Sequence, residues 1–91
     1  MGLRRESRLK VNQEVIVTAQ GLIGMPSMAG RVVDMSGSGV RVRVPNPVPC
    51  GSPVKVESEH MMMLGEVARC DTDTGGYVVG LILSRSTPLA S

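Results

Sequence analysis

The sequence predicts an all-β domain, a six-stranded antiparallel barrel, and three observations support this fold class. Valine-rich runs alternate with short Gly, Pro and Ser segments about every ten residues, a spacing typical of small barrels and sandwiches. No stretch repeats apolar residues at helical spacing over several turns. The apolar residues are almost all aliphatic, with Val dominant, Tyr77 the single aromatic and no Phe or Trp. Branched aliphatic side chains favour strands, and a closed barrel leaves no sheet edge open.

The first three expected strands are separated by two breaker segments. Residues 21–26 contain Gly and Pro, and residues 36–39 contain two glycines, so each segment favours a turn. The third strand alternates valine and arginine without exception, which predicts one buried face and outward Arg41 and Arg43. The expected ranges are Glu14–Ala19, Ala29–Asp34 and Gly39–Val44.

The last three expected strands are bounded by the proline-rich segment 45–51 and the Asp- and Gly-containing segment 71–76. Residues 61–64 of the Met-rich fifth strand cannot all point inward unless Gly65 marks a bulge that resets the register. The sixth strand is apolar on both faces, and outward apolar side chains on these two strands indicate a cover by a helix, a partner or a second copy. The expected ranges are Pro53–Ser58, Met61–Cys70 and Tyr77–Ser84.

The length of 91 residues predicts a single domain with one core. We expect a flexible N-terminal segment over residues 1–12, the barrel over residues 13–85 and a disordered tail over residues 86–91.

Composition excludes several classes of protein. The net charge of +2 is small, no apolar run reaches the roughly 20 residues of a membrane span, and no signal peptide is evident. Two cysteines are too few for a disulfide framework. We therefore expect a soluble cytoplasmic protein without membrane insertion. No nucleophile–base pair or metal-binding set can be assembled from the sequence, so neither catalysis nor a metal or other cofactor is expected.

Two short clusters contain the residues best suited to binding. The first is basic, with Arg4, Arg5 and Arg8 close together, and an arginine fork pairs with a phosphate or with the O6/N7 edge of guanine. The second is the turn Asp34–Gly39, where Asp34 and Ser36 offer acceptors for the remaining guanine edge. Its two glycines can adopt positive φ. Taken separately, each cluster also has an ordinary interpretation, a solvated basic tail and a hairpin turn with local hydrogen bonds.

The order and spacing of these clusters resemble the PilZ domain family. Arg-x-x-x-Arg at Arg4 and Arg8 is followed by Asp-x-Ser-x-x-Gly at Asp34, Ser36 and Gly39. Downstream, residues 65–69 look like the fifth strand of that family and residues 77–81 like its last strand, so the resemblance covers nearly the whole chain.

The resemblance implies a six-stranded PilZ-type barrel that binds the bacterial second messenger cyclic di-GMP. Arg4 and Arg8 would hold guanine and phosphate, with Arg5 as a helper. Asp34 and Ser36 would contact guanine, and Gly39 would permit its close approach.

Two departures from the family pattern stand out. Arg69 is at about the place where many members carry a large aromatic that stacks on a base, and a guanidinium can stack there instead. A helix follows the last strand in many members, whereas this chain ends soon after it, so we expect that helix to be short or missing.

Three functions are consistent with these features. The first is a cyclic di-GMP sensor or adaptor domain that couples the level of the messenger to a partner protein or an attached domain. The second is a PilZ-like protein-interaction adaptor that works without nucleotide. The third is a small RNA-binding barrel, which is disfavoured because Tyr77 is the only aromatic available for base stacking. We therefore expect no nucleic-acid partner.

Overall fold

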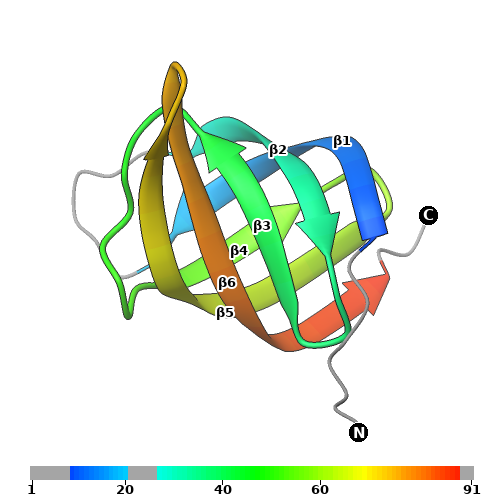
Figure 1. The fold of residues 1–91 in the computed structure, drawn as a ribbon. Helices are drawn as coiled ribbons and strands as arrows, with labels where there is room; N and C mark the ends of the chain where they lie inside the picture. Colours follow the sequence, from blue (N-terminus) through cyan, green and yellow to red (C-terminus); the bar gives the residue numbers. More distant parts are fainter. Residues whose placement is uncertain (1–8, 21–26, 89–91) are drawn as a thin grey trace, which may run out of the picture.

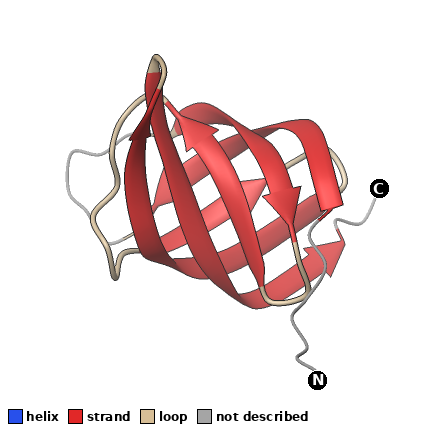
Figure 2. Cartoon of the chain, viewed as in Figure 1, coloured by secondary structure: helices blue, strands red, loops and turns tan. Residues whose placement is uncertain are grey.

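The computed structural model describes residues 9–20 and 27–88, and these residues form a closed barrel of antiparallel strands (Figures 1 and 2). The strand order around the barrel is β1-β2-β3-β6-β5-β4. The described residues contain no helix, and hence none that could cross a membrane. The six-stranded barrel predicted from the sequence is confirmed. The strands are β1 (Leu9–Ala19), β2 (Met28–Met35), β3 (Gly39–Val44), β4 (Pro53–Glu57), β5 (Met61–Asp73) and β6 (Gly76–Pro88).

The core is built mainly from valine side chains that point into the barrel. In β3, Val40, Val42 and Val44 are buried, while Arg41 and Arg43 between them are exposed. This is the alternation predicted from the sequence, and β3 has the predicted bounds. Valine fits such a core because its branched side chain packs closely on a pleated strand and loses little rotamer freedom there.

Several strands are longer than predicted because a partner strand pairs with their ends. Strand β1 begins at Leu9, where Leu9 and Lys10 pair with Met35 and Asp34 of β2. Strand β6 continues to Pro88, which pairs with Met61 of β5. Residues 9–12 thus belong to β1 and residues 86–88 to β6, whereas the rest of the expected N-terminal segment and tail lies outside the described residues.

The β5–β6 pair shifts register between Leu64 and Gly65, where a bulge was predicted. The extra residue belongs to β6, because Leu64 pairs with Arg85 and Gly65 with Leu83. Gly65 is needed for a close approach, since a Cβ atom there would lie 2.6 Å from the carbonyl oxygen of Ile82. Alternation within β5 therefore continues inward through Met63, Gly65 and Val67.

Two further β-bulges decide which polar side chains reach the outer surface. In β2, Val32 pairs with the inward Val42 and Asp34 pairs with the outward Arg41, so Val33 is the extra residue. In β5, Val67 pairs with Leu81 and Arg69 with Gly80, so Ala68 is the extra residue. In regular strands without the bulges, the side chains of Asp34 and Arg69 would point into the barrel, as those of Val32 and Val67 do. Each bulge therefore turns one polar residue outward.

Candidate functional site

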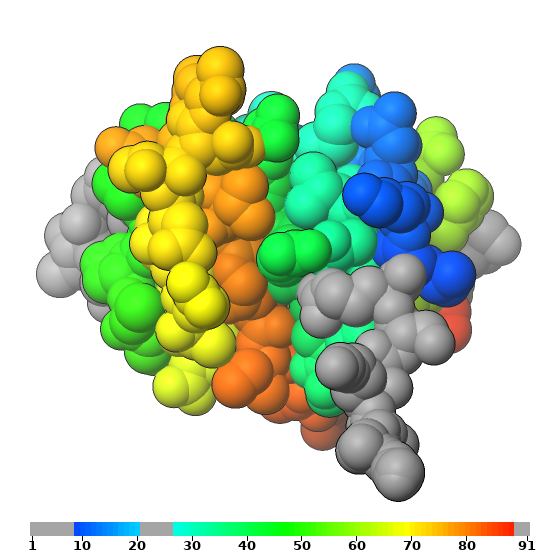
Figure 3. Space-filling view, in the orientation of Figure 1, coloured from blue at the N-terminus to red at the C-terminus, as the bar shows by residue number. Residues whose placement is uncertain are grey.

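A row of residues in register crosses the outer face of five neighbouring strands. Strand pairing places Lys10 beside Asp34, Asp34 beside Arg41, Arg41 beside Gly80 and Gly80 beside Arg69. The row brings three cationic side chains, one carboxylate and one position without a side chain onto one surface. We call these five residues the cross-strand row. In Figure 3, β3 (green), β6 (orange) and β5 (yellow) lie side by side on the face turned to the viewer.

Asp34 and Arg41 form a bidentate ion pair at the centre of this row. The Nε of Arg41 donates to Oδ1 and Oδ2 of Asp34, both at 3.0 Å, and Nη2 donates to Oδ2. The Asp34 side chain is 8% exposed and that of Arg41 is 51% exposed, so the guanidinium connects a covered carboxylate to the surface. The hydrogen bonds and charge of Asp34 raise the pKa of Arg41 above its ordinary value. Arg41 is therefore a permanent cation at this site.

The turn between β2 and β3 lies next to the row. The backbone N–H of Ser36 donates to the carbonyl oxygen of Gly39 at 2.8 Å, which closes the hairpin. The N–H of Leu83 in β6 donates to the carbonyl oxygen of Ser38 at 2.9 Å, which ties the turn to the next strand. Neither glycine of the turn has the positive φ that the sequence allowed. Gly39 instead permits a close approach, because a Cβ there would lie 3.0 Å from the carbonyl oxygen of Leu81.

Two adjoining hollows, of about 340 and 370 Å³, lie along this face. The first is bounded by Ser36 and Gly39 at the turn, and the second by Asp71 and Asp73 of β5. Arg41, Arg69 and Gly80 line both hollows, so the two form one groove over β3, β6 and β5. We call it the β3–β6–β5 groove.

Gly80 leaves a slot in the floor of the groove, between Arg41 and Arg69. A Cβ at Gly80 would meet only the Cβ of Arg69, at an ordinary 3.8 Å. Neither backbone conformation nor packing therefore requires glycine there. Ile82, next to the slot, also lines the groove and is 60% exposed. A flat ring of a ligand would fit against Gly80 and Ile82 of β6, between the guanidinium groups of Arg41 and Arg69. This exposed isoleucine belongs to the strand whose outward apolar face was expected to need a cover.

The structure brings most of the described candidate residues together. Ser36, Gly39 and Arg69 line the same hollow, and Asp34 lies beside it, held by Arg41. Arg69 also contacts Asp71, with 3.2 Å between its Nε and Oδ2. The three arginines of the first cluster (Arg4, Arg5 and Arg8) lie outside the described residues.

Sequence reasoning missed Arg41 and Gly80 as residues of the groove. The valine–arginine alternation of β3 did place Arg41 outward. Its contact with Asp34 depends on the bulge at Val33, for which the sequence has no clear signal.

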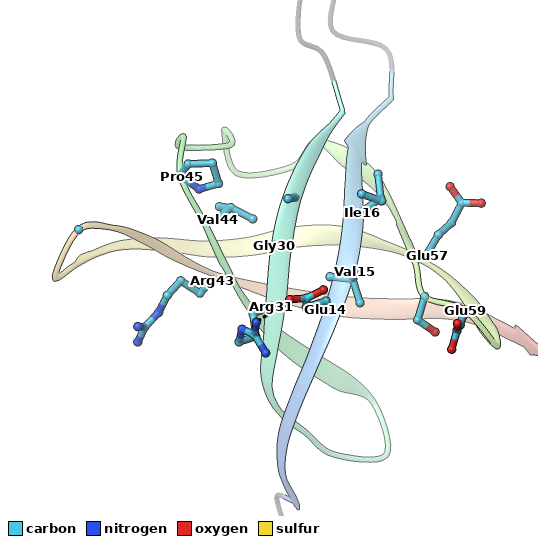
Figure 4. A pocket seen from close by; sticks show the side chains of 13 residues that line it. Glu14, Val15, Ile16, Gly30, Arg31, Arg43, Val44, Pro45, Glu57 and Glu59 are labelled. Carbon is cyan, nitrogen blue, oxygen red and sulfur yellow. Dashed lines mark hydrogen bonds and ion pairs between the residues drawn. The ribbon is translucent and has the colours of Figure 1, made fainter.

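A larger hollow, of about 800 Å³, lies elsewhere, and of the predicted binding residues that the structure describes none lines it. It is lined by β1, β2 and the ends of β3 and β4, with Glu57 and Glu59 on one side and Arg43 on the opposite side (Figure 4). Within it, Glu14 and Arg31 form an ion pair of 2.9 Å. This hollow is lined by both acidic and basic side chains and by none of the described motif residues, so its larger volume does not make it the candidate site.

The described residues contain no group of three or more His, Cys, Asp or Glu side chains that could hold a metal ion. The family model for the PilZ domain matches residues 3–88 of the chain. No curated protein matches the chain.

Proposed function

Because the chain belongs to the PilZ domain family, whose members are binding and adaptor domains and generally receptors of cyclic di-GMP, we propose that it binds cyclic di-GMP in the β3–β6–β5 groove. The observation that carries the proposal is the meeting of Ser36, Gly39 and Arg69 in one hollow, with Asp34 beside it. Asp34, Ser36 and Gly39 lie close together in the sequence, from the end of β2 to the start of β3, whereas Arg69 comes from β5, 30 residues after Gly39.

The donors and acceptors of the site match the two chemical parts of this ligand. The carboxylate of Asp34 accepts from the N1–H and N2–H groups of guanine, and the hydroxyl of Ser36 adds a further polar contact. Arginine forks pair with phosphate oxygens or with the O6/N7 edge of guanine. In our proposal one base lies over Gly80 and Ile82, flanked by the guanidinium of Arg69, which takes the place of the aromatic stacking residue.

The arginine motif of the N-terminal cluster completes the proposed site. Leu9 pairs with Met35 and Lys10 with Asp34, so the described chain enters the barrel directly beside the second motif. Arg8 precedes Leu9 in the sequence. We propose that Arg4 and Arg8, assisted by Arg5, hold a guanine and the phosphates against the turn.

In this proposal the domain is a sensor and not an enzyme. Binding of the messenger changes the surface that the barrel offers to a partner protein or an attached domain. The setting is the bacterial cytoplasm, where a nucleotide messenger and free thiols such as those of Cys50 and Cys70 are expected.

A second candidate is the adaptor that works without nucleotide, and the Asp34–Arg41 contact favours it. The carboxylate expected to bind guanine already has a bidentate partner within the barrel, so the fold does not need a ligand to neutralise it.

Backbone NMR during titration with cyclic di-GMP distinguishes the two candidates. The sensor predicts saturable shifts at Ser36, Gly39, Gly80 and Arg69, with little change at Ala29 in the larger hollow. The adaptor predicts no shifts in the groove at any nucleotide concentration. Shifts confined to the larger hollow would refute the assignment of the site.

A further inference from the structure

We propose that Arg41 is an internal competitor for the guanine edge: it holds Asp34 before the ligand binds, and guanine replaces it there. This inference rests on the proposed function and concerns how tightly the site binds. Arg41 belongs to neither of the two sequence motifs.

The chemistry of the contact supports the exchange. Arg41 presents Nε–H and Nη2–H to the two oxygens of Asp34. Guanine contains the same arrangement of atoms, since its N1–H and N2–H groups flank one carbon as the two N–H groups of a guanidinium do. Both therefore make two parallel N–H···O bonds to a carboxylate. An arginine on Asp34 is a close chemical substitute for a guanine on Asp34.

The geometry shows why the two cannot be accommodated side by side. Asp34 has a side chain only 8% exposed, and it is not among the residues that line the groove, whereas Arg41 is. The guanidinium of Arg41 lines the groove and contacts both oxygens of the carboxylate. A guanine therefore gains the same two oxygens only after Arg41 has moved.

The groove has space for the Arg41 side chain after it leaves Asp34. That side chain is 51% exposed, and it lines both hollows of the groove beside the Gly80 slot. Once released, the guanidinium lies at the open side of the groove, where water hydrates it. The exchange therefore gives up the bidentate Asp34–Arg41 contact without a replacement of equal strength, and this loss lowers the affinity of the site.

Calorimetric titration of the full chain with cyclic di-GMP tests the proposal with three variants. Arg41→Gln removes the competitor. Arg43→Gln is the matched control, because Arg43 lies on the same strand, is also 51% exposed, pairs with a carboxylate (Asp73) and does not itself line the groove. Arg41→Lys keeps the charge but has no bidentate fork.

We expect Arg41→Gln to bind with a Kd about fivefold lower than Arg43→Gln, the upper value for a partly exposed ion pair. Arg41→Lys should lie between wild type and Arg41→Gln. If Arg41→Gln binds as Arg43→Gln does, or more weakly, the competition is refuted and the sensor proposal stands. If neither wild type nor Arg41→Gln binds, the sensor proposal itself fails, and this inference with it.

Thermal unfolding gives a second, independent measurement. Arg41→Gln removes the bidentate contact to a covered carboxylate and should lower the Tm measured without ligand. Because the stabilisation by a ligand grows with the logarithm of its concentration divided by Kd, the same excess of cyclic di-GMP should raise the Tm of Arg41→Gln by more than that of wild type. An equal or smaller rise would contradict the exchange.

Discussion

Replacing Gly80 separates the requirements of the fold from those of the ligand. A Cβ at this position meets only the Cβ of Arg69 at 3.8 Å, and the backbone has no positive φ, so alanine fits without strain. Glycine in a strand interior costs about 0.5–1 kcal/mol relative to alanine. For a domain of this size, Gly80→Ala should therefore raise Tm by about 2–8 °C.

The effect on binding should have the opposite sign. Valine fills the slot between Arg41 and Arg69, where we place one base of the ligand. Loss of one stacked base costs about 1–3 kcal/mol, which is a 5- to 150-fold weaker affinity. We expect Gly80→Ala to weaken binding less than Gly80→Val.

Differential scanning calorimetry and isothermal titration with cyclic di-GMP measure the two effects on the same samples. We predict that Gly80→Ala is at least as stable as wild type and binds cyclic di-GMP less tightly. A folded Gly80→Val with unchanged Kd would show that no base lies over the slot, and the groove would lose its assignment.

The remaining predictions concern the fold and the charges of the site. Gly65→Ala should destabilise the barrel by about 1–3 kcal/mol in urea unfolding, because its Cβ would lie 2.6 Å from the carbonyl oxygen of Ile82; an unchanged urea midpoint would contradict the close approach. Val56→Ala should cost about 2 kcal/mol in the same assay, because Val56 is fully buried and its truncation leaves a cavity in the core. The Kd for cyclic di-GMP should rise with ionic strength, because the Arg69 side chain is 76% exposed and salt screens its attraction to phosphates. A Kd independent of salt would show that Arg69 does not attract the ligand through its charge.

The parts of the fold that the sequence predicted well are those with a simple alternation between clear turn signals. Strand β3 is the best case, since Val40, Val42 and Val44 fill one face and turn residues lie on both sides. Strand ends were harder to place. Leu9 and Pro88 belong to strands because of their partners across the sheet, and local composition does not identify those partners.

The sequence singled out Asp34, Ser36 and Gly39 from motif spacing and Arg69 from its place in the fifth strand, but not Arg41 or Gly80. The structure places Ser36, Gly39 and Arg69 around one hollow with Asp34 beside it, and their role as ligand-binding residues stays a prediction. The outward orientation of Asp34 and Arg69 depends on single extra residues at Val33 and Ala68. A bulge of this kind is set by the register with the neighbouring strand, which is not visible in one strand's own sequence.

Isothermal titration of the wild-type chain and Asp34→Ala with cyclic di-GMP tests most directly whether the groove binds this nucleotide. We predict saturable binding to wild type at micromolar or lower concentration, and no measurable binding to a folded Asp34→Ala. Equal heats for the two proteins, or no heat with wild type, would contradict this prediction.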